Sequence, residues 1–178
     1  RTIEESRRMA ALLEGRGLPH IVLNGLQDAD ESAIVAKAGQ RGAITIATNM
    51  AGRGTDIKLN SQSRAAGGLH AIVSEPHLSH RIDRQLIGRS SRQGDLGSAQ
   101  IFVSADDLLI TEHAPRWGDR LRRLAGADGE CRTDLSSEIR RIQQTVEESH
   151  ARQRATLLKQ DEWLDQVRQI LSGAEAKC

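Results

Sequence analysis

The sequence predicts an α/β fold built on a parallel sheet and followed by one long helix. Over the first 104 residues, four short apolar runs are separated by segments with helical patterns. Such alternation is typical of strand–helix–strand units. From residue 135 to residue 171 the chain holds neither glycine nor proline, and apolar residues recur at helical spacing. That helix is too long for a sheet layer, so it predicts a second structural unit.

The first elements have recognisable beginnings and ends. Thr2 and Glu5 form a capping-box pattern, which predicts a helix that ends near Gly15–Gly17. The apolar run at 20–24 predicts a short buried strand. The next helix is predicted over 28–39, between an aspartate that can cap it and a glycine that can end it.

Three further strands are predicted at 43–48, 68–74 and 99–104, because each run is apolar or rich in β-branched residues. Ser79 is a plausible cap for a helix between the last two strands, and Gly88 is a plausible end for it. The composition then changes near residues 115–118.

Composition excludes several classes of function. Twenty-five basic residues oppose 24 acidic ones, so the net charge of +1 gives no general attraction to nucleic acid or anionic lipid. Cys131 and Cys178 are too few for a four-cysteine zinc site and too far apart for a redox pair, which favours a reducing compartment. No apolar run in this sequence reaches transmembrane length, and we expect no secretory leader.

The first candidate site covers residues 48–56, directly after a predicted strand. Ligands of open α/β sheets bind beyond the carboxyl ends of the strands. Gly52 and Gly54 allow a sharp turn close to a ligand, and Arg53 offers a planar donor fork to a phosphate or carboxylate. Asp56 can accept from a ribose hydroxyl, a water or a neighbouring arginine. The alternative is an ordinary glycine-rich turn with a surface arginine.

The second candidate site covers residues 85–95, where Arg89 and Arg92 are flanked by glycines. If the preceding helix continues to Arg92, both guanidinium groups lie on one face and point at one anion. Two arginines at a terminal phosphate would neutralise charge during phosphoryl transfer. The alternative is a solvated basic helix face. The chain has no Gly-x-x-x-x-Gly-Lys-Ser/Thr loop, so the two segments together predict half of a catalytic site.

Three histidines, His70, His77 and His80, lie between the two candidate sites, with Glu75 nearby. No cysteine or carboxylate completes a convincing ligand set. We therefore interpret them as surface or supporting residues and expect no metal site.

Residues 38–57 closely resemble the preprotein translocase motors of the SecA family. Segments 67–70, 81–83 and 85–95 follow in the family's order and spacing. A match of this length is highly specific. It favours phosphate sensing over an ordinary glycine-rich turn at the first site and over a solvated basic helix face at the second. It covers most of residues 1–110 and, more loosely, the long helix.

The resemblance implies a RecA-like parallel sheet, the second motor lobe of a P-loop NTPase, over residues 1–112. Residues 113–134 would connect this lobe to a helix at 135–178 that resembles the family's helical scaffold. ATP with Mg²⁺ is the implied cofactor, and the magnesium ligands would lie outside this chain.

Individual roles follow by position in the matching motifs. Arg89 and Arg92 correspond to the arginines that contact the terminal phosphate. Arg53 and Asp56 look like the nucleotide-coupling pair, accompanied by the two glycines around Arg53. Gln85 resembles the glutamine that opens the arginine motif.

The chain departs from the family pattern at a few positions. Ser91 replaces a usual glycine, Ile87 replaces a usual arginine, and residues 75–77 read Glu-Pro-His instead of Glu-Arg-His. These departures indicate a divergent member. The family's first lobe, with its phosphate loop, has no counterpart here, and neither has the opening strand of the second lobe. We therefore expect a fragment that hydrolyses no ATP alone.

The implied partners are the missing N-terminal motor lobe, the peptide-binding domain, a membrane protein-conducting channel and preprotein substrates, with nucleic acid not expected. The implied location is cytoplasmic, peripheral to the inner membrane. Two other functions stay open. One is a lobe of a superfamily 2 nucleic-acid helicase, which shares the Gln-x-x-Gly-Arg-x-x-Arg pattern, and the other is a non-catalytic regulatory module.

Overall fold

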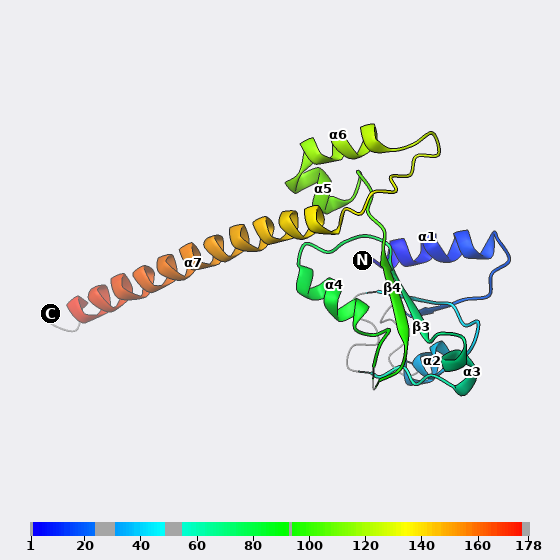
Figure 1. Ribbon diagram of the computed structural model, residues 1–178. Helices are drawn as coiled ribbons and strands as arrows, with labels where there is room; N and C mark the ends of the chain where they lie inside the picture. The colour runs from blue at the N-terminus through cyan, green and yellow to red at the C-terminus, as the bar shows by residue number, and fades with distance from the viewer. Residues whose placement is uncertain (1, 24–30, 49–54, 93, 176–178) are drawn as a thin grey trace. The chain divides into compact units, whose positions relative to one another are not determined.

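The computed structural model describes residues 2–23, 31–48, 55–92 and 94–175, and the chain divides into two compact units (Figure 1). The sheet unit comprises Arg1–Ser74 and Arg81–Phe102. The helical unit comprises Glu75–His80 and Val103–Cys178. Short parallel sheets and helices confirm the predicted α/β class. No helix among the described residues is long and apolar enough to cross a bilayer.

The sheet unit contains two pairs of parallel strands. β1 (Ile21–Leu23) pairs with β2 (Thr45–Ala47), and β3 (Leu69–Val73) pairs with β4 (Gly97–Ile101). The fourth strand begins and ends earlier than the predicted range 99–104. The Phe102 N–H still donates to the Val73 carbonyl of β3 at 2.9 Å, whereas the backbone N–H of Ser104 donates to the Asp107 carboxylate at 2.7 Å.

Two helices precede β2. α1 (Ile3–Glu14) has the predicted capping box, since Thr2 Oγ1 accepts from the Glu5 N–H at 3.1 Å and the Glu5 carboxylate accepts from the Thr2 N–H at 2.8 Å. α2 (Glu31–Ala38) ends just before Gly39, as predicted. Its predicted start at 28–30 lies outside the described residues.

A short helix, α3 (Ser61–Ala65), was not predicted. Asn60 caps it, because its Oδ1 accepts from the Ser63 N–H at 2.7 Å. The Ser63 hydroxyl in turn donates to the carbonyl of Gly39 at 2.9 Å. This bond anchors the chain after Asp56 to the end of α2.

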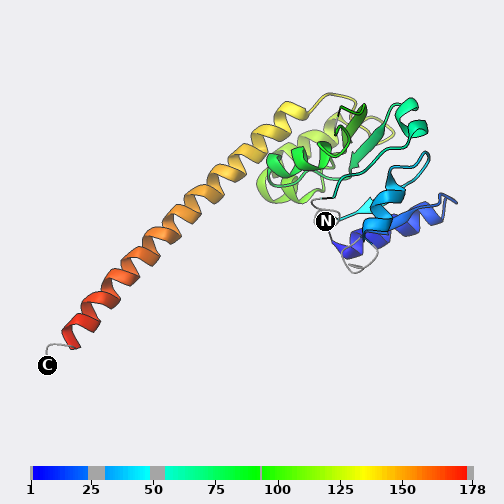
Figure 2. The ribbon, with the colours of Figure 1, turned by 90° about the horizontal axis from the view of Figure 1, so that it is seen from below.

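The helical unit contains α5 (Leu108–His113), α6 (Pro115–Leu124) and α7 (Ser136–Glu175). The sequence predicted only the last of these, as a helix over 135–178. Figure 2 shows α7 extending well beyond its contact with α5. The buried residues of this unit's core are Leu109, Ile110, Ile139 and Val146. Along α7, every described side chain from residue 151 to residue 166 is exposed.

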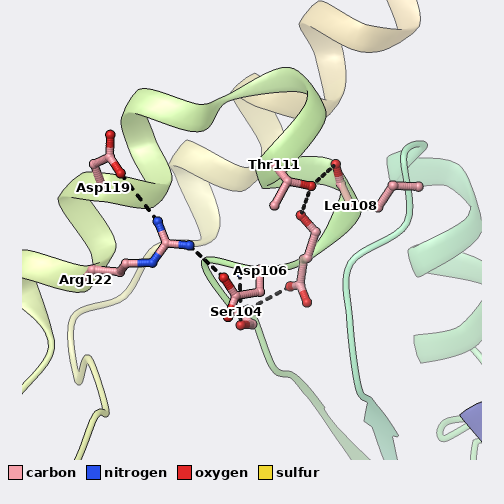
Figure 3. A network of polar contacts seen from close by, with 7 residues as sticks. Ser104, Asp106, Leu108, Thr111, Asp119 and Arg122 are labelled. Atoms are coloured by element: carbon pink, nitrogen blue, oxygen red, sulfur yellow. Dashed lines mark hydrogen bonds and ion pairs between the residues drawn. The ribbon is translucent and has the colours of Figure 1, made fainter.

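An arginine joins α6 to the turn before α5 (Figure 3). Arg122 donates to Asp106 Oδ1 at 2.6 Å and to Asp119 Oδ1 at 3.4 Å. Gly118 permits α6 to approach α5, because a Cβ there would lie 3.0 Å from Ile110 Cγ2. These contacts hold the two short helices together.

Candidate functional site

The first candidate segment follows β2 at its carboxyl end, as the sequence predicted. Asp56 lies in the irregular chain between β2 and α3, and its side chain is 27% exposed. The predicted residues Gly52, Arg53 and Gly54 lie outside the described residues.

The second candidate segment begins on α4 (His80–Ile87) and continues into the loop after it. The helix ends at Ile87, directly before Gly88, as predicted. The alternative in which it continues to Arg92, with both arginines on one helix face, is wrong. Beyond the last helical bond, from the Gly88 N–H to the Arg84 carbonyl, the chain tightens into shorter turns. Both the N–H and the hydroxyl of Ser90 donate to the carbonyl of Ile87, at 3.0 and 2.7 Å. The two bonds turn the chain away from the helix axis.

An ion pair joins described residues of the two segments. Arg92 Nη1 lies 3.6 Å from Asp56 Oδ1, and the two side chains are 41% and 27% exposed. A neighbouring arginine is among the partners that the sequence allowed for Asp56. This contact brings the chain after β2 and the arginine loop together within the sheet unit.

Gln85 and Arg89 take different positions around the end of α4. Gln85 lies on the helix and is exposed, whereas Arg89 lies in the turn directly after it and is half-buried. Arg89 is thus set by the turn that ends the helix, and Arg92 by the loop beyond. The two predicted phosphate contacts are positioned by different local structures.

A second ion pair fixes the far end of the arginine loop, and sequence reasoning missed it. Arg64 Nε on α3 lies 2.8 Å from Asp95 Oδ1. Because α3 itself was not predicted, no local pattern indicated that Arg64 belongs to the site. The asparagine at position 60, a typical helix cap, is the signal that could have located α3.

Close backbone contacts also shape this loop. A Cβ on Gly97, the first residue of β4, would overlap the carbonyl oxygen of Ser90. At Gly68, φ is 85°, and a Cβ would overlap the carbonyl oxygen of Leu96. Both glycines are required where the loop returns to the β3–β4 pair.

Two of the three histidines between the segments have local partners. His70 Nδ1 lies 2.8 Å from Ser98 Oγ across the β3–β4 pair. His77 Nδ1 accepts from the Ser79 N–H at 3.2 Å. Within the described part of the chain, no group of three His, Cys, Asp or Glu side chains could hold a metal ion.

The chemistry of this arrangement suits an anion. A guanidinium group donates to carboxylate and to phosphate oxygens with the same planar fork. Arg92 now faces a carboxylate and is partly exposed, so a phosphate oxygen could take the place of Asp56. The site therefore fits a phosphate-bearing ligand.

Comparison with known proteins identifies the family. The family model described as "SecA P-loop domain" matches residues 1–65 and 60–129. The chain belongs to the SecA family. Although the SecA model is named for a P-loop, the sequence of this chain contains no Gly-x-x-x-x-Gly-Lys-Ser/Thr motif.

Individual SecA proteins match nearly the whole chain. A protein translocase subunit SecA of Chlorobium limicola is 46% identical over 173 residues, which cover 96% of this chain and 17% of the relative. SecA 2 of Bordetella avium is 42% identical over 93% of this chain and 25% of its own length. SecA of Nitratidesulfovibrio vulgaris is 44% identical over 96% of this chain and 20% of its own length. The chain thus spans about a fifth of these SecA relatives.

Proposed function

We propose that this chain is the nucleotide-sensing motor lobe of a SecA-type ATPase that drives ATP-dependent preprotein translocation across a membrane. The relatives that support this assignment are named protein translocase subunits. The contact between Asp56 and Arg92 carries the proposal, because it joins a strand-end motif to an arginine motif in one phosphate-compatible site.

In this proposal, residues 1–112 form the second RecA-like lobe, 113–134 connect it, and 135–178 belong to the helical scaffold. Bound ATP with Mg²⁺ would supply the phosphoryl group, with the magnesium ligands outside this chain. Arg89 and Arg92 would face the terminal phosphate from this lobe and stabilise the charge that develops there.

The remaining predicted residues would couple the bound nucleotide to the lobe. Gly52, Arg53 and Gly54 would approach it from the end of β2, and Gln85 would do so from α4. Asp56 would hold Arg92 whenever no phosphate does. Exchange of Arg92 between these two partners would make the site sensitive to the nucleotide.

The partners that the family resemblance implies are proposed with the function. They are an N-terminal motor lobe, a peptide-binding domain, a membrane protein-conducting channel and preprotein substrates, for a cytoplasmic protein at the inner membrane. The family match favours this reading over a superfamily 2 helicase lobe. An aromatic content of 2% also leaves few side chains on which nucleic-acid bases could stack.

The decisive variant is Arg92→Ala in the intact protein. We expect its preprotein-stimulated ATPase kcat to fall at least about tenfold, since arginine fingers contribute on the order of 10³-fold or more. Arg123→Ala, an exposed arginine on α6, is the matched control and should retain activity. Loss of a nucleic-acid-stimulated activity instead would support a helicase, and no effect on turnover would support a non-catalytic module.

A further inference from the structure

One short stretch of the sheet unit makes two side-chain contacts with the arginine loop. It covers residues 56–64, which follow β2 and include most of α3. Asp56, at its start, faces the guanidinium group of Arg92. Arg64, near its end, faces the carboxylate of Asp95. The same stretch therefore contacts the loop at Arg92 and again three residues later.

The two contacts differ in their geometry. Arg64 Nε lies 2.8 Å from Asp95 Oδ1, which is the distance of a charge-assisted hydrogen bond. Arg92 Nη1 lies 3.6 Å from Asp56 Oδ1, which is too long for a hydrogen bond. The contact at Asp95 is therefore the firmer one, and the contact at Arg92 is easier to exchange for another anion.

Asp95 is also linked to Arg92 through the backbone. The Asp95 N–H donates to the carbonyl of Arg92 at 2.9 Å. Gly94, the residue before Asp95, has φ 82°, a left-handed conformation that glycine adopts without steric cost. An interaction that holds the Asp95 side chain therefore also restricts the backbone that carries the Arg92 side chain.

Arg64 lies on a helix that is anchored on both sides. The hydroxyl of Ser63, a buried residue, donates to the Gly39 carbonyl at 2.9 Å, and the Ser63 carbonyl accepts from the Gly68 N–H at 2.9 Å. A Cβ on Gly39 would overlap the carbonyl oxygen of Lys58, so the chain before α3 packs directly on the end of α2. The backbone of Arg64 is thus well fixed, although its side chain is 56% exposed.

We propose that Arg64 is a positioning residue for the phosphate-directed arginine loop. Through Asp95 it holds the loop while Arg92 exchanges Asp56 for a phosphate oxygen. Without Arg64, the loop would lose its firmer side-chain contact, and the Arg92 guanidinium group would occupy the productive position less often. This inference rests on the proposed function, because only there does Arg92 face a phosphate.

The first test measures the order of the loop without relying on catalysis. In the intact protein, Arg64→Ala is compared with Gln62→Ala by hydrogen exchange of peptides that cover residues 90–96. Gln62 is the matched control, since it is an exposed residue of the same helix. We expect Arg64→Ala to speed exchange about two- to fivefold, the range that a partly exposed ion pair allows. The effect should appear without nucleotide and with a non-hydrolysable ATP analogue and Mg²⁺, and equal exchange of the two variants in either state would overturn the inference.

The second test separates positioning from general stability. Arg64→Ala should lower the preprotein-stimulated ATPase kcat about two- to fivefold, the range of the same ion pair. KM for ATP should change less than about 1.5-fold, because misplaced groups lose transition-state contacts first. Arg64→Lys retains a charged donor and should recover most of kcat, and Gln62→Ala should behave as wild type. Equal kcat values for Arg64→Ala and Gln62→Ala would refute the positioning role.

A double-mutant cycle tests whether Arg64 acts through Asp95. Asp95→Ala should lower kcat as well, and the double variant Arg64→Ala/Asp95→Ala should lose no more activity than the more affected single variant. Losses that multiply in the double variant would show that Arg64 acts by another route, and the role assigned here would be wrong.

The two proposals can fail separately. If Arg92→Ala leaves ATP turnover unchanged, the proposed function is wrong, and the exchange measurement still decides whether Arg64 orders the loop. If Arg92→Ala abolishes turnover while Arg64→Ala matches Gln62→Ala, the function stands and the positioning role is wrong.

Discussion

The carboxylate of Asp56 lies 3.6 Å from the guanidinium group of Arg92, and this contact joins the end of β2 to the loop after α4. Both side chains are partly exposed, although Asp56 Oδ1 itself is buried, and a separation of 3.6 Å is too long for a hydrogen bond. Salt that reaches the exposed part of the guanidinium group weakens the attraction further. The pair therefore contributes little to stability and is well suited to opening when a competing anion arrives.

A double-mutant cycle with Asp56→Asn and Arg92→Gln tests this interpretation. We expect a coupling free energy of about 0.2–1 kcal/mol from urea unfolding at low salt, as for other exposed ion pairs. In about 1 M NaCl the coupling should fall, because the screening length then drops to about 3 Å. A coupling free energy above about 2 kcal/mol that persists in high salt would show that the pair mainly stabilises the fold, and it would contradict a pair that opens for a competing anion.

The arginine loop should be sensitive to the glycine at its end. Gly97→Ala places a methyl group against the Ser90 carbonyl, which must move together with the chain that carries Arg92. We expect a loss of about 1–3 kcal/mol in the free energy of unfolding, typical of overpacking. The measurement is urea unfolding followed by circular dichroism.

Gly15→Ala provides the comparison for that variant. At Gly15 the backbone has φ −61°, and the nearest atom to an added Cβ is 3.4 Å away. Alanine should therefore be neutral or stabilising by a few tenths of a kcal/mol. If both glycine variants lose equal stability, the contact with Ser90 is not the cause.

Local signals account for the parts of the fold that the sequence predicted. The capping box of Thr2 and Glu5 and the β-branched run around Ile46 depend on neighbours in the chain, and both formed as expected. The short helices α3 and α5 escaped prediction because helices of five and six residues have little stability of their own. Whether such short helices form depends on tertiary packing, such as that of Leu109 in the core.

The candidate site was predictable in its parts but not in its connections. Glycine and arginine motifs located Asp56 and Arg92, but no sequence pattern indicates that these two side chains touch. One alternative continued α4 to Arg92. It was wrong because the Ser90 hydroxyl donates to the Ile87 carbonyl and turns the chain, and a serine at this position gives no such signal in the sequence. Arg64 was missed because its contact with Asp95 depends on tertiary structure.

The core of the helical unit offers a sharp stability test. Leu109 is fully buried, whereas its neighbour Leu108 is 41% exposed. Leu109→Ala should reduce the free energy of unfolding by about 2–5 kcal/mol. Leu108→Ala should change it by less than about 1 kcal/mol.

Tryptophan fluorescence can report this unit directly. Trp117 packs against the core cluster, and Trp163 is 61% exposed on α7. A Trp163→Phe background leaves Trp117 as the reporter of unfolding in urea. Similar losses for the Leu108 and Leu109 variants would contradict the assigned core.

The start of α7 should weaken in acid. The backbone N–H of Ser136 donates to Asp134 Oδ1 at 2.9 Å, and this hydrogen bond lowers the pKa of the Asp134 carboxyl. A carboxyl whose pKa is lower in the folded state stabilises that state above its unfolded pKa, and the contribution is lost as the pH falls through the folded pKa.

Side-chain NMR titration of Asp134 in the chain and in a short unfolded peptide gives the comparison. We expect a lower midpoint in the chain, together with smaller protection factors at the start of α7 at acidic pH, where a protection factor is the ratio of the intrinsic to the observed exchange rate at the same pH and so corrects for the intrinsic pH dependence of amide exchange. Asp134→Ala should remove the pH dependence of these protection factors. Equal midpoints in chain and peptide would contradict the hydrogen bond.

The 178-residue chain alone is expected to hydrolyse no ATP. Its sequence contains no phosphate loop, and its phosphate-directed groups are arginines, which stabilise charge but neither bind magnesium nor activate water. The measurement is phosphate release by the purified chain with magnesium and ATP. A contaminating ATPase is recognised because Arg92→Ala leaves its rate unchanged. Magnesium-dependent turnover that disappears in Arg92→Ala would show that one lobe is sufficient, and the two-lobe site proposed here would have to be abandoned.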